Sequence, residues 1–262
     1  MEIALVNYSN SKYKNAQKEL NRTCFKFGIT KLFSYNDKWL KKQKFYAENK
    51  KILDAKRGGG YWAWKPFVIL TAMNELEEGD ILIYMDSGAN FVKDITILAQ
   101  LCKENKGILL FDTSHKNEIW TKRDCFVEMK CDSNKYWKSN QAYGTYQVYE
   151  KNNKSLSFLK EYLFYCTKST CITDDFNQLG KENFFVFKDH RHDQSILTNI
   201  AIKNKIKLFP DPSQFGNEQK RPYPQLIDSH RDTKRFRSKI RKLLNKLNKL
   251  IKELFKTQNL EI

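Results

Sequence analysis

The segment Arg57-Gly-Gly-Gly-Tyr-Trp-Ala-Trp-Lys65 combines residue types that could bind phosphate together with a flat ring. Its glycines let the backbone approach a ligand closely, and Arg57 and Lys65 could bind phosphate oxygens. Trp62 and Trp64 present flat faces for stacking on a sugar or a base. The spacing matches neither the Walker phosphate loop nor the Rossmann glycine pattern. The alternative is a turn that simply buries both tryptophans.

A second segment, Ile81-Leu-Ile-Tyr-Met-Asp86-Ser87-Gly88, is an apolar run that ends in an acid. A carboxylate at the end of a buried strand could hold a divalent cation against phosphate, because hard cations bind both kinds of oxygen. Ser87 and Gly88 would let the backbone lie close to a nucleotide. Alternatively, Asp86 only caps the turn that follows the strand.

These segments require an open α/β sheet to position them. Apolar patterns predict strands at residues 3–8, 31–35, 81–86 and 107–112 and helices at residues 11–25, 39–56, 67–76, 95–105, 156–166 and 194–203. Residues 118–150 are expected to be irregular, and residues 209–230 to form an extended loop. Ligands of such sheets bind at the carboxyl ends of the strands. We therefore expect Asn7, Asp86 and Asp112 on one rim, if their strands are parallel.

The order of these motifs resembles that of a known enzyme group. Gly58-Gly-Gly-Tyr-Trp-Ala-Trp-Lys-Pro66, a helix, and then Gly79-Asp-Ile-Leu-Ile-Tyr-Met-Asp-Ser-Gly88 are similar to segments of bacterial glycosyltransferases for capsule and lipopolysaccharide O-antigen sugars, including galactosyl- and galactofuranosyltransferases. More distant GT-A families also have a Gly-Gly-Tyr segment before an Asp-x-Asp motif. His192-Asp193-Gln194-Ser195 and Asp228-Ser-His230-Arg231 resemble later motifs of the family. The resemblance spans about residues 1–231.

The resemblance implies a GT-A-like open mixed sheet flanked by helices, a nucleotide-sugar donor such as a UDP-sugar, and Mn²⁺ or Mg²⁺. Asp86 corresponds to the first acid of Asp-x-Asp, but Gly88 replaces the second. His230 could complete the metal site, as a late histidine does in related families. Asn7 and Tyr8 match the place where such folds hold the nucleobase.

The missing second acid leaves a metal-free alternative open. In that case Arg57, Lys65 or Arg231 would neutralise the leaving diphosphate. A sugar transfer would also need a group that acts on the acceptor hydroxyl. Asp193 is the candidate for this base or for an acceptor clamp, with Gln194 hydrogen-bonded to sugar hydroxyls. Asp193 is equally suited to capping the helix that follows it.

Composition bounds the class of protein. The chain has 262 residues, 40% of them hydrophobic, which is enough to form a core. Its six cysteines show no Cys-x-x-Cys pair, and no signal peptide or membrane-spanning run is visible. We therefore expect free, buried thiols and a cytoplasmic protein, with residues 1–230 as the catalytic domain.

The net charge of +17 is unevenly distributed, because residues 231–262 alone contribute +8. From Phe236 onward, apolar residues recur every three or four positions, and Lys and Arg fill the other face. This pattern predicts an amphipathic helix that binds an anionic membrane on the inner face of the plasma membrane. A coiled coil that makes a homo-oligomer and docking on the catalytic domain are the alternatives.

Three classes of function fit the sequence. The first is a hexosyltransferase that moves a galactose-type sugar from a UDP-sugar to a cell-surface glycan or a lipid-linked acceptor. The second is a nucleic-acid-binding protein, suggested by the charge, although the sequence contains no known nucleic-acid-binding motif and no such partner is expected. The third is an inert, membrane-attached scaffold with a degenerate transferase fold, because Gly88 stands in place of an acid.

Overall fold

The computed structural model describes residues 1–230; the predicted helix at residues 231–262, and with it Arg231, lies outside the described residues. The strands are β1 (Ile3–Ser9), β2 (Lys31–Asn36), β3 (Ile81–Met85), β4 (Ala89–Phe91), β5 (Ile108–Lys116), β6 (Asn140–Ala142), β7 (Tyr146–Glu150), β8 (Leu208–Phe209) and β9 (Ile227–Ser229). The longer helices are α1 (Lys14–Thr23), α6 (Trp64–Asn74), α7 (Thr96–Glu104), α11 (Asn153–Cys166) and α13 (His192–Lys203).

Short helical turns fill the connections. They are η1 (Ser11–Tyr13), η2 (Cys24–Phe27), α2 (Asp37–Leu40), α3 (Lys44–Glu48), α4 (Lys50–Leu53), α5 (Gly58–Tyr61), α8 (Asn117–Trp120), α9 (Arg123–Glu128), α10 (Asn134–Trp137), α12 (Ser169–Ile172) and η3 (Gln214–Gly216). The sequence predicted one helix over residues 39–56, but the structure has the three short helices α2, α3 and α4 there.

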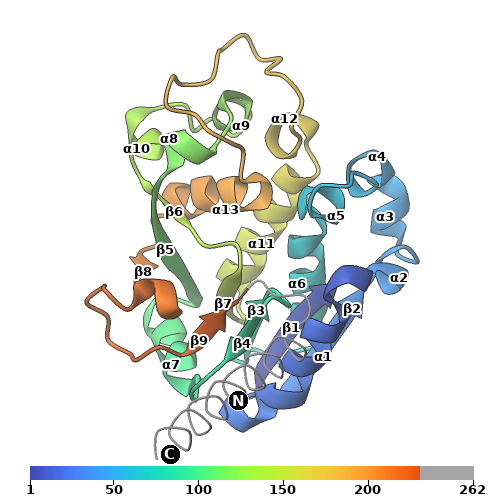
Figure 1. Ribbon diagram of the computed structural model, residues 1–262, viewed down its shortest axis with the longest axis vertical. Helices are drawn as coiled ribbons and strands as arrows, with labels where there is room; N and C mark the ends of the chain where they lie inside the picture. Colours follow the sequence, from blue (N-terminus) through green and yellow to red (C-terminus); the bar gives the residue numbers. More distant parts are fainter. Residues whose placement is uncertain (231–262) are drawn as a thin grey trace, which may run out of the picture.

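Within residues 1–230, seven strands form one mixed sheet in the order β2-β1-β3-β7-β5-β6, with β8 beside β5 (Figure 1). β1 runs parallel to β2 and β3, and β7 pairs antiparallel with both β3 and β5. β1, β3 and β5 therefore point the same way, and their carboxyl ends lie at one edge of the sheet. The predicted open α/β sheet is confirmed.

Two apolar layers hold the sheet between helices. Successive residues of a strand face opposite sides. In β3, Leu82 and Tyr84 pack in the layer that contains α6 and α11, whereas Ile81, Ile83 and Met85 pack against α1 and α7. Both faces are covered, so every residue of β3 is buried. This explains why the strand appears in the sequence as an uninterrupted apolar run.

Strand β7 lies in the region 118–150, and the expectation of irregular structure there was wrong. Tyr146 and Val148 pack on one face of the sheet and Tyr149 on the other. Gln147 is fully buried and accepts a hydrogen bond from the Tyr149 hydroxyl. Because every position is buried, the strand shows no alternation of apolar and polar residues that the sequence could reveal.

The last described segment returns to the site. β9 pairs antiparallel with β4, and the backbone N–H of His230 donates to the carbonyl of Gly88 at 3.1 Å. Residues 209–230, predicted to be an extended loop, are largely so, with the short elements η3 and β9.

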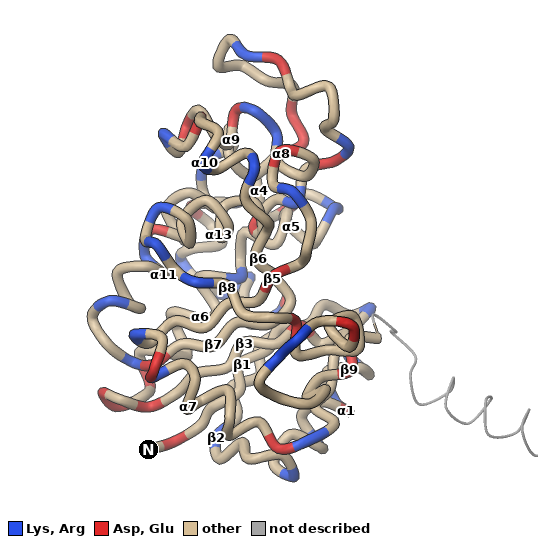
Figure 2. The backbone as a smooth tube through the Cα atoms, turned by 90° about the vertical axis from the view of Figure 1, so that its left-hand side faces the viewer, with Lys and Arg blue, Asp and Glu red and all other residues tan. Residues whose placement is uncertain are grey.

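Charged residues of both signs are spread over the loops and helices, whereas β1, β3 and β7 are almost uncharged (Figure 2). Helices long and apolar enough to cross a bilayer do not occur among the described residues. All six cysteines are buried and none is in a disulfide, as the sequence predicted.

Candidate functional site

A cleft of about 500 Å³ opens where β1 and β3 end. Five stretches of chain that are distant in sequence line it: residues 8–13, 56–65, 86–88, 144–145 and 190–194, with Ser229 at the side. Both motifs that the sequence analysis selected, the glycine-rich segment and the strand-end acid, therefore face the same cavity. The cleft lies where ligands of open α/β sheets bind.

The glycine-rich segment enters the cleft in an uncommon conformation. Five consecutive residues, Gly58 to Trp62, have positive φ angles of 60°, 60°, 98°, 52° and 58°. For Tyr61 and Trp62, which carry a Cβ, this region costs about 1–2 kcal/mol each. Strain of this kind concentrates at functional sites, where surrounding contacts enforce it.

Close contacts show why glycine is needed at two of these positions. A Cβ atom on Gly58 would lie 2.3 Å from the Trp62 ring, and one on Gly60 would lie 2.6 Å from the Cα of Leu53. At Gly59, in contrast, the nearest atom would be the Asn10 side-chain nitrogen at 4.0 Å. Gly59 thus faces the loop after β1 across a short gap.

The two tryptophans have different environments. Trp64 is only 5% exposed, stacks obliquely on Tyr8 at 4.0 Å and donates from its indole N–H to the carbonyl of Gly58. Trp62 is half-buried and packs beside His192. Trp64 therefore supports the loop and Tyr8, whereas Trp62 keeps a partly accessible face at the cleft.

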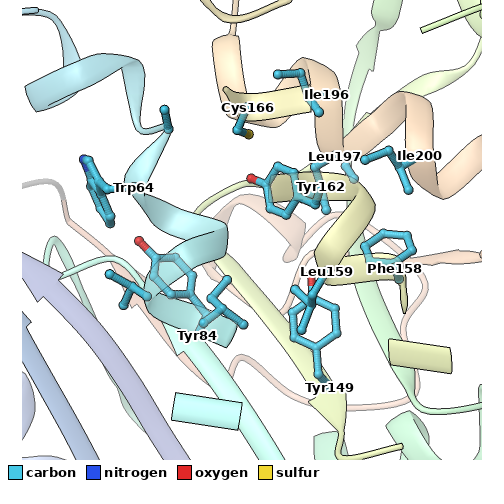
Figure 3. Close-up of a cluster of buried hydrophobic side chains, with 14 of the residues drawn as sticks. Trp64, Tyr84, Tyr149, Phe158, Leu159, Tyr162, Cys166, Ile196, Leu197 and Ile200 are labelled. Atoms are coloured by element: carbon cyan, nitrogen blue, oxygen red, sulfur yellow. The ribbon is translucent and has the colours of Figure 1, made fainter. Parts of the chain in front are cut away.

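A continuous polar chain forms the floor of the cleft. The ammonium of Lys65, in the first turn of α6, lies 2.7 Å from Asp193 Oδ2 and 3.6 Å from Asp86 Oδ1. Tyr162 donates to the same oxygen of Asp193, and Tyr84 donates to the same oxygen of Asp86. Figure 3 shows Tyr84 and Tyr162 among apolar neighbours, with both hydroxyl oxygens directed toward α6. Each carboxylate thus shares the central ammonium and has its own tyrosine.

Burial and charge act against each other in this chain. Burial raises the pKa of the Asp193 carboxyl above its ordinary value, although the nearby ammonium of Lys65 acts in the opposite direction. Burial would lower the pKa of Lys65, but the carboxylates of Asp193 and Asp86 outweigh it and hold that pKa above its ordinary value. Lys65 therefore keeps its charge at neutral pH, and Asp193 is more basic than an ordinary carboxylate.

The remaining contacts fix the backbone around Lys65. Its ammonium also donates to the carbonyl of Gly144 at 2.8 Å and lies over the Tyr84 ring. The side chain of Gln194 accepts from the N–H of Gly144 and donates to Gln141. Both ends of the Gln194 amide are thus hydrogen-bonded within the protein, which limits what it can offer a sugar hydroxyl.

Arg57 joins the glycine-rich segment to the long connection between α12 and α13. Its guanidinium forms ion pairs with Asp174 and Asp189 and also donates to the carbonyl of His190. This arginine therefore has two carboxylate partners already. Its structural effect is to hold the glycine-rich segment against the residues that precede Asp193.

The two histidines before Asp193 are buried. His190 accepts from the N–H of Lys122 at Nδ1, and its Nε2 lies 2.8 Å from the carbonyl of Cys171. Burial holds the pKa of His190 well below its ordinary value, so it is neutral. His192 has a positive φ of 47° and its Nδ1 bonds to the carbonyl of Ile172. These contacts agree with the expectation that neither histidine is a metal ligand.

Most of the candidate residues line the cleft. They are Tyr8, Arg57, Trp62, Trp64, Lys65, Asp86, Ser87, Asp193 and Gln194. Ser87 donates to the carbonyl of Tyr8 and so joins β3 to β1. Sequence analysis missed Tyr84, Tyr162, Gly144, Lys12 and Lys56. Only Tyr84 had a usable signal, because it precedes Asp86 by two positions on a strand and so faces the same side.

Three candidates are placed elsewhere. Asn7 is fully buried and is hydrogen-bonded to Asn21 and Gln17, so it ties β1 to α1 and does not line the cleft. Asp112 accepts from Asn140 and also lies outside the cleft. The His230 backbone is close to Gly88, but its side chain does not line the cavity.

The residues present do not fit the two-acid metal site that the resemblance implies. Asp86 already accepts from Tyr84 and faces the ammonium of Lys65, and Gly88 contributes no acid. Within residues 1–230, no three His, Cys, Asp or Glu side chains are grouped so that they could hold an ion.

Comparisons with known proteins give the following findings. No protein-family model and no curated protein matches the chain. Among solved structures it is similar to the bifunctional glycosyltransferase WbbM in its apo form (TM-score 0.48, 9% identity, 81% of this chain and 39% of that one). It is also similar to apo mouse xyloside xylosyltransferase 1 (TM-score 0.45, 9% identity, 87% and 97%). A third similarity is to the apo glycosyltransferase GlyE of Streptococcus pneumoniae TIGR4 (TM-score 0.44, 13% identity, 88% and 54%).

The chain thus spans 39% of the length of WbbM and 54% of that of GlyE. Because all these TM-scores lie below 0.5, the proposal for function rests on the residues of the site itself.

Proposed function

We propose that the protein is a glycosyltransferase that uses a nucleotide-sugar donor. The observation that carries the proposal is the chain Tyr84–Asp86–Lys65–Asp193–Tyr162 on the floor of a cleft at the carboxyl ends of β1 and β3. Carboxylates there can bind sugar hydroxyls and accept a proton. Trp62 and the lysines of the rim suit a base and a diphosphate.

The two acids have different surroundings and take different roles in the proposal. The side chain of Asp86 is 31% exposed and faces the cleft, which suits contact with the donor sugar. Asp193 is 4% exposed and has a raised pKa, which suits a base for the acceptor hydroxyl. Transfer breaks the bond between sugar C1 and the diphosphate oxygen and forms a bond from C1 to the acceptor oxygen. The proton of the acceptor hydroxyl passes to the carboxylate.

The finer parts of the proposal come from the sequence. They are a galactose-type sugar, UDP as the nucleotide, and a cell-surface glycan or lipid-linked acceptor, all implied by the resemblance at Gly58–Pro66 and Asp86. The basic, amphipathic pattern of residues 231–262 supports attachment to an anionic membrane. An acceptor carried on a lipid would then lie near the cleft.

The proposal is tested by calorimetric titration with UDP and by hydrolysis of a panel of nucleotide sugars. We expect binding of UDP, and turnover of at least one donor that falls about 100-fold or more in Asp86→Asn and Asp193→Asn. Asp112→Asn is the matched control, because Asp112 ends up on the same strand edge but outside the cleft. Failure to bind any nucleotide, or equal activity in all three variants, would refute the proposal.

A further inference from the structure

The ammonium of Lys65 lies where a cation would be expected in this cleft. Its neighbours are a carboxylate oxygen of Asp193 at 2.7 Å, the carbonyl of Gly144 at 2.8 Å and a carboxylate oxygen of Asp86 at 3.6 Å. Two carboxylates and a carbonyl from three separate segments are the kind of oxygen set that a hard divalent cation takes. In this protein the set surrounds an amino group instead.

Lys65 is held firmly in this position. It is 2% exposed, it belongs to the first turn of α6, and its ammonium lies over the Tyr84 ring. A divalent cation that bound Asp86 and Asp193 together would have to displace a buried ammonium and leave it without a partner. Uncompensated burial of a charge is strongly unfavourable, so this exchange is not expected.

A single ammonium cannot also neutralise a diphosphate. Lys65 offsets one of the two carboxylate charges on the floor, so the floor keeps a net negative charge. The positive charge that a diphosphate needs must therefore come from the rim. Arg57 is a poor source, because Asp174 and Asp189 already pair with it.

Two exposed lysines supply that charge. Lys12 and Lys56 both line the cleft, and neither forms an ion pair with a carboxylate of residues 1–230. They belong to facing loops, since a Cβ on Gly59 would lie 4.0 Å from the Asn10 side chain. A diphosphate in the cleft would thus meet one lysine from each side.

We propose that this protein binds its donor without a divalent cation: Lys65 takes the cation position beside Asp86 and Asp193, and Lys12 and Lys56 neutralise the diphosphate. This inference rests on the proposed function and makes it more specific. It departs from the Mn²⁺ or Mg²⁺ dependence that the resemblance implies. It also assigns the phosphate contacts to two lysines outside the recognised motifs.

The test is titration of the full chain with UDP by calorimetry, once in excess EDTA and once with Mn²⁺. We expect dissociation constants that agree within about two-fold, and binding about ten-fold or more weaker in Lys12→Gln/Lys56→Gln under both conditions. The matched control is Lys14→Gln/Lys51→Gln, which removes the same charge from exposed neighbouring positions that do not line the cleft. This control should bind like the wild type.

Three results would overturn the inference. The first is UDP binding that weakens ten-fold or more in EDTA and returns with Mn²⁺; the proposed function would then stand, but as a metal-dependent one. The second is normal UDP binding by Lys12→Gln/Lys56→Gln. The third is the absence of UDP binding under both conditions, which would refute the proposed function and this inference with it.

Discussion

The left-handed run in the glycine-rich segment can be tested with two neighbouring substitutions. Gly58→Ala and Gly59→Ala each place an alanine at a φ of 60°. The backbone cost of that conformation, about 1–2 kcal/mol, is therefore the same for both. The two positions differ in what the new methyl group meets.

The added methyl group allows the difference to be worked out. At Gly58 it would lie 2.3, 2.4 and 2.7 Å from three carbons of the Trp62 ring, so the ring must move. Overpacking of this kind costs about 1–3 kcal/mol. At Gly59 only the Asn10 side chain is near, at 4.0 Å, and no such cost arises. We expect losses in the free energy of unfolding of about 2–5 kcal/mol for Gly58→Ala and about 1–2 kcal/mol for Gly59→Ala.

The assay is urea unfolding of the wild type and both variants, repeated in a Trp62→Ala background. Removing the indole removes the clash, so Gly58→Ala should then cost no more than Gly59→Ala. The double-mutant cycle should return a coupling energy of about 1–3 kcal/mol between Gly58 and Trp62. Equal losses for the two alanines in the wild-type background, or a coupling energy near zero, would refute the reasoning.

Two further predictions concern buried groups, and they add to those already given for the two acids and for the cation. Tyr162→Phe removes a hydrogen bond to the carboxylate of Asp193 and should lower the free energy of unfolding by about 1.5–3 kcal/mol; Tyr149→Phe, which loses a bond to a neutral amide, should cost only about 0.5–1.5 kcal/mol, and equal costs in denaturant unfolding would contradict a charged Asp193. Burial lowers the pKa of His190, so below pH 6.5 the unfolded chain takes up a proton that the folded one does not; stability should fall with pH from about 6.5 downward, and His190→Gln should reduce this slope by up to about 1.4 kcal/mol per pH unit, whereas an unchanged slope would mean that His190 is charged when folded.

Local patterns in the sequence were enough for part of the fold. The strands that end near Asn7 and Asp86 were correctly predicted, because a strand buried on both faces must be apolar throughout. Pro66 in the first turn of α6 correctly indicated where that helix begins. The same rule failed for β7, whose Tyr-Gln-Val-Tyr-Glu sequence contains buried polar groups that are paired only in the folded sheet.

The residue types of the site were also visible in the sequence, but their partners were not. Asp86 and Lys65 were both selected as ligand-binding residues, yet nothing in their spacing indicated that the ammonium would lie between two carboxylates. Asn7 shows the opposite outcome: it ends β1 as predicted, but Gln17 and Asn21 engage its side chain away from the cleft. Whether a strand-end residue faces the cleft depends on which helix packs beside it.

The sequence by itself therefore determined the α/β class, the strand whose end carries Asp86 and the glycine-rich segment that must bend beside it, because these depend on burial and backbone freedom over a few residues. Only the tertiary structure decided that Lys65 is an internal counter-ion for Asp86 and Asp193. An ammonium is placed by the nearest oxygens in space, and here these come from the end of β3, the start of α13 and the loop before β7.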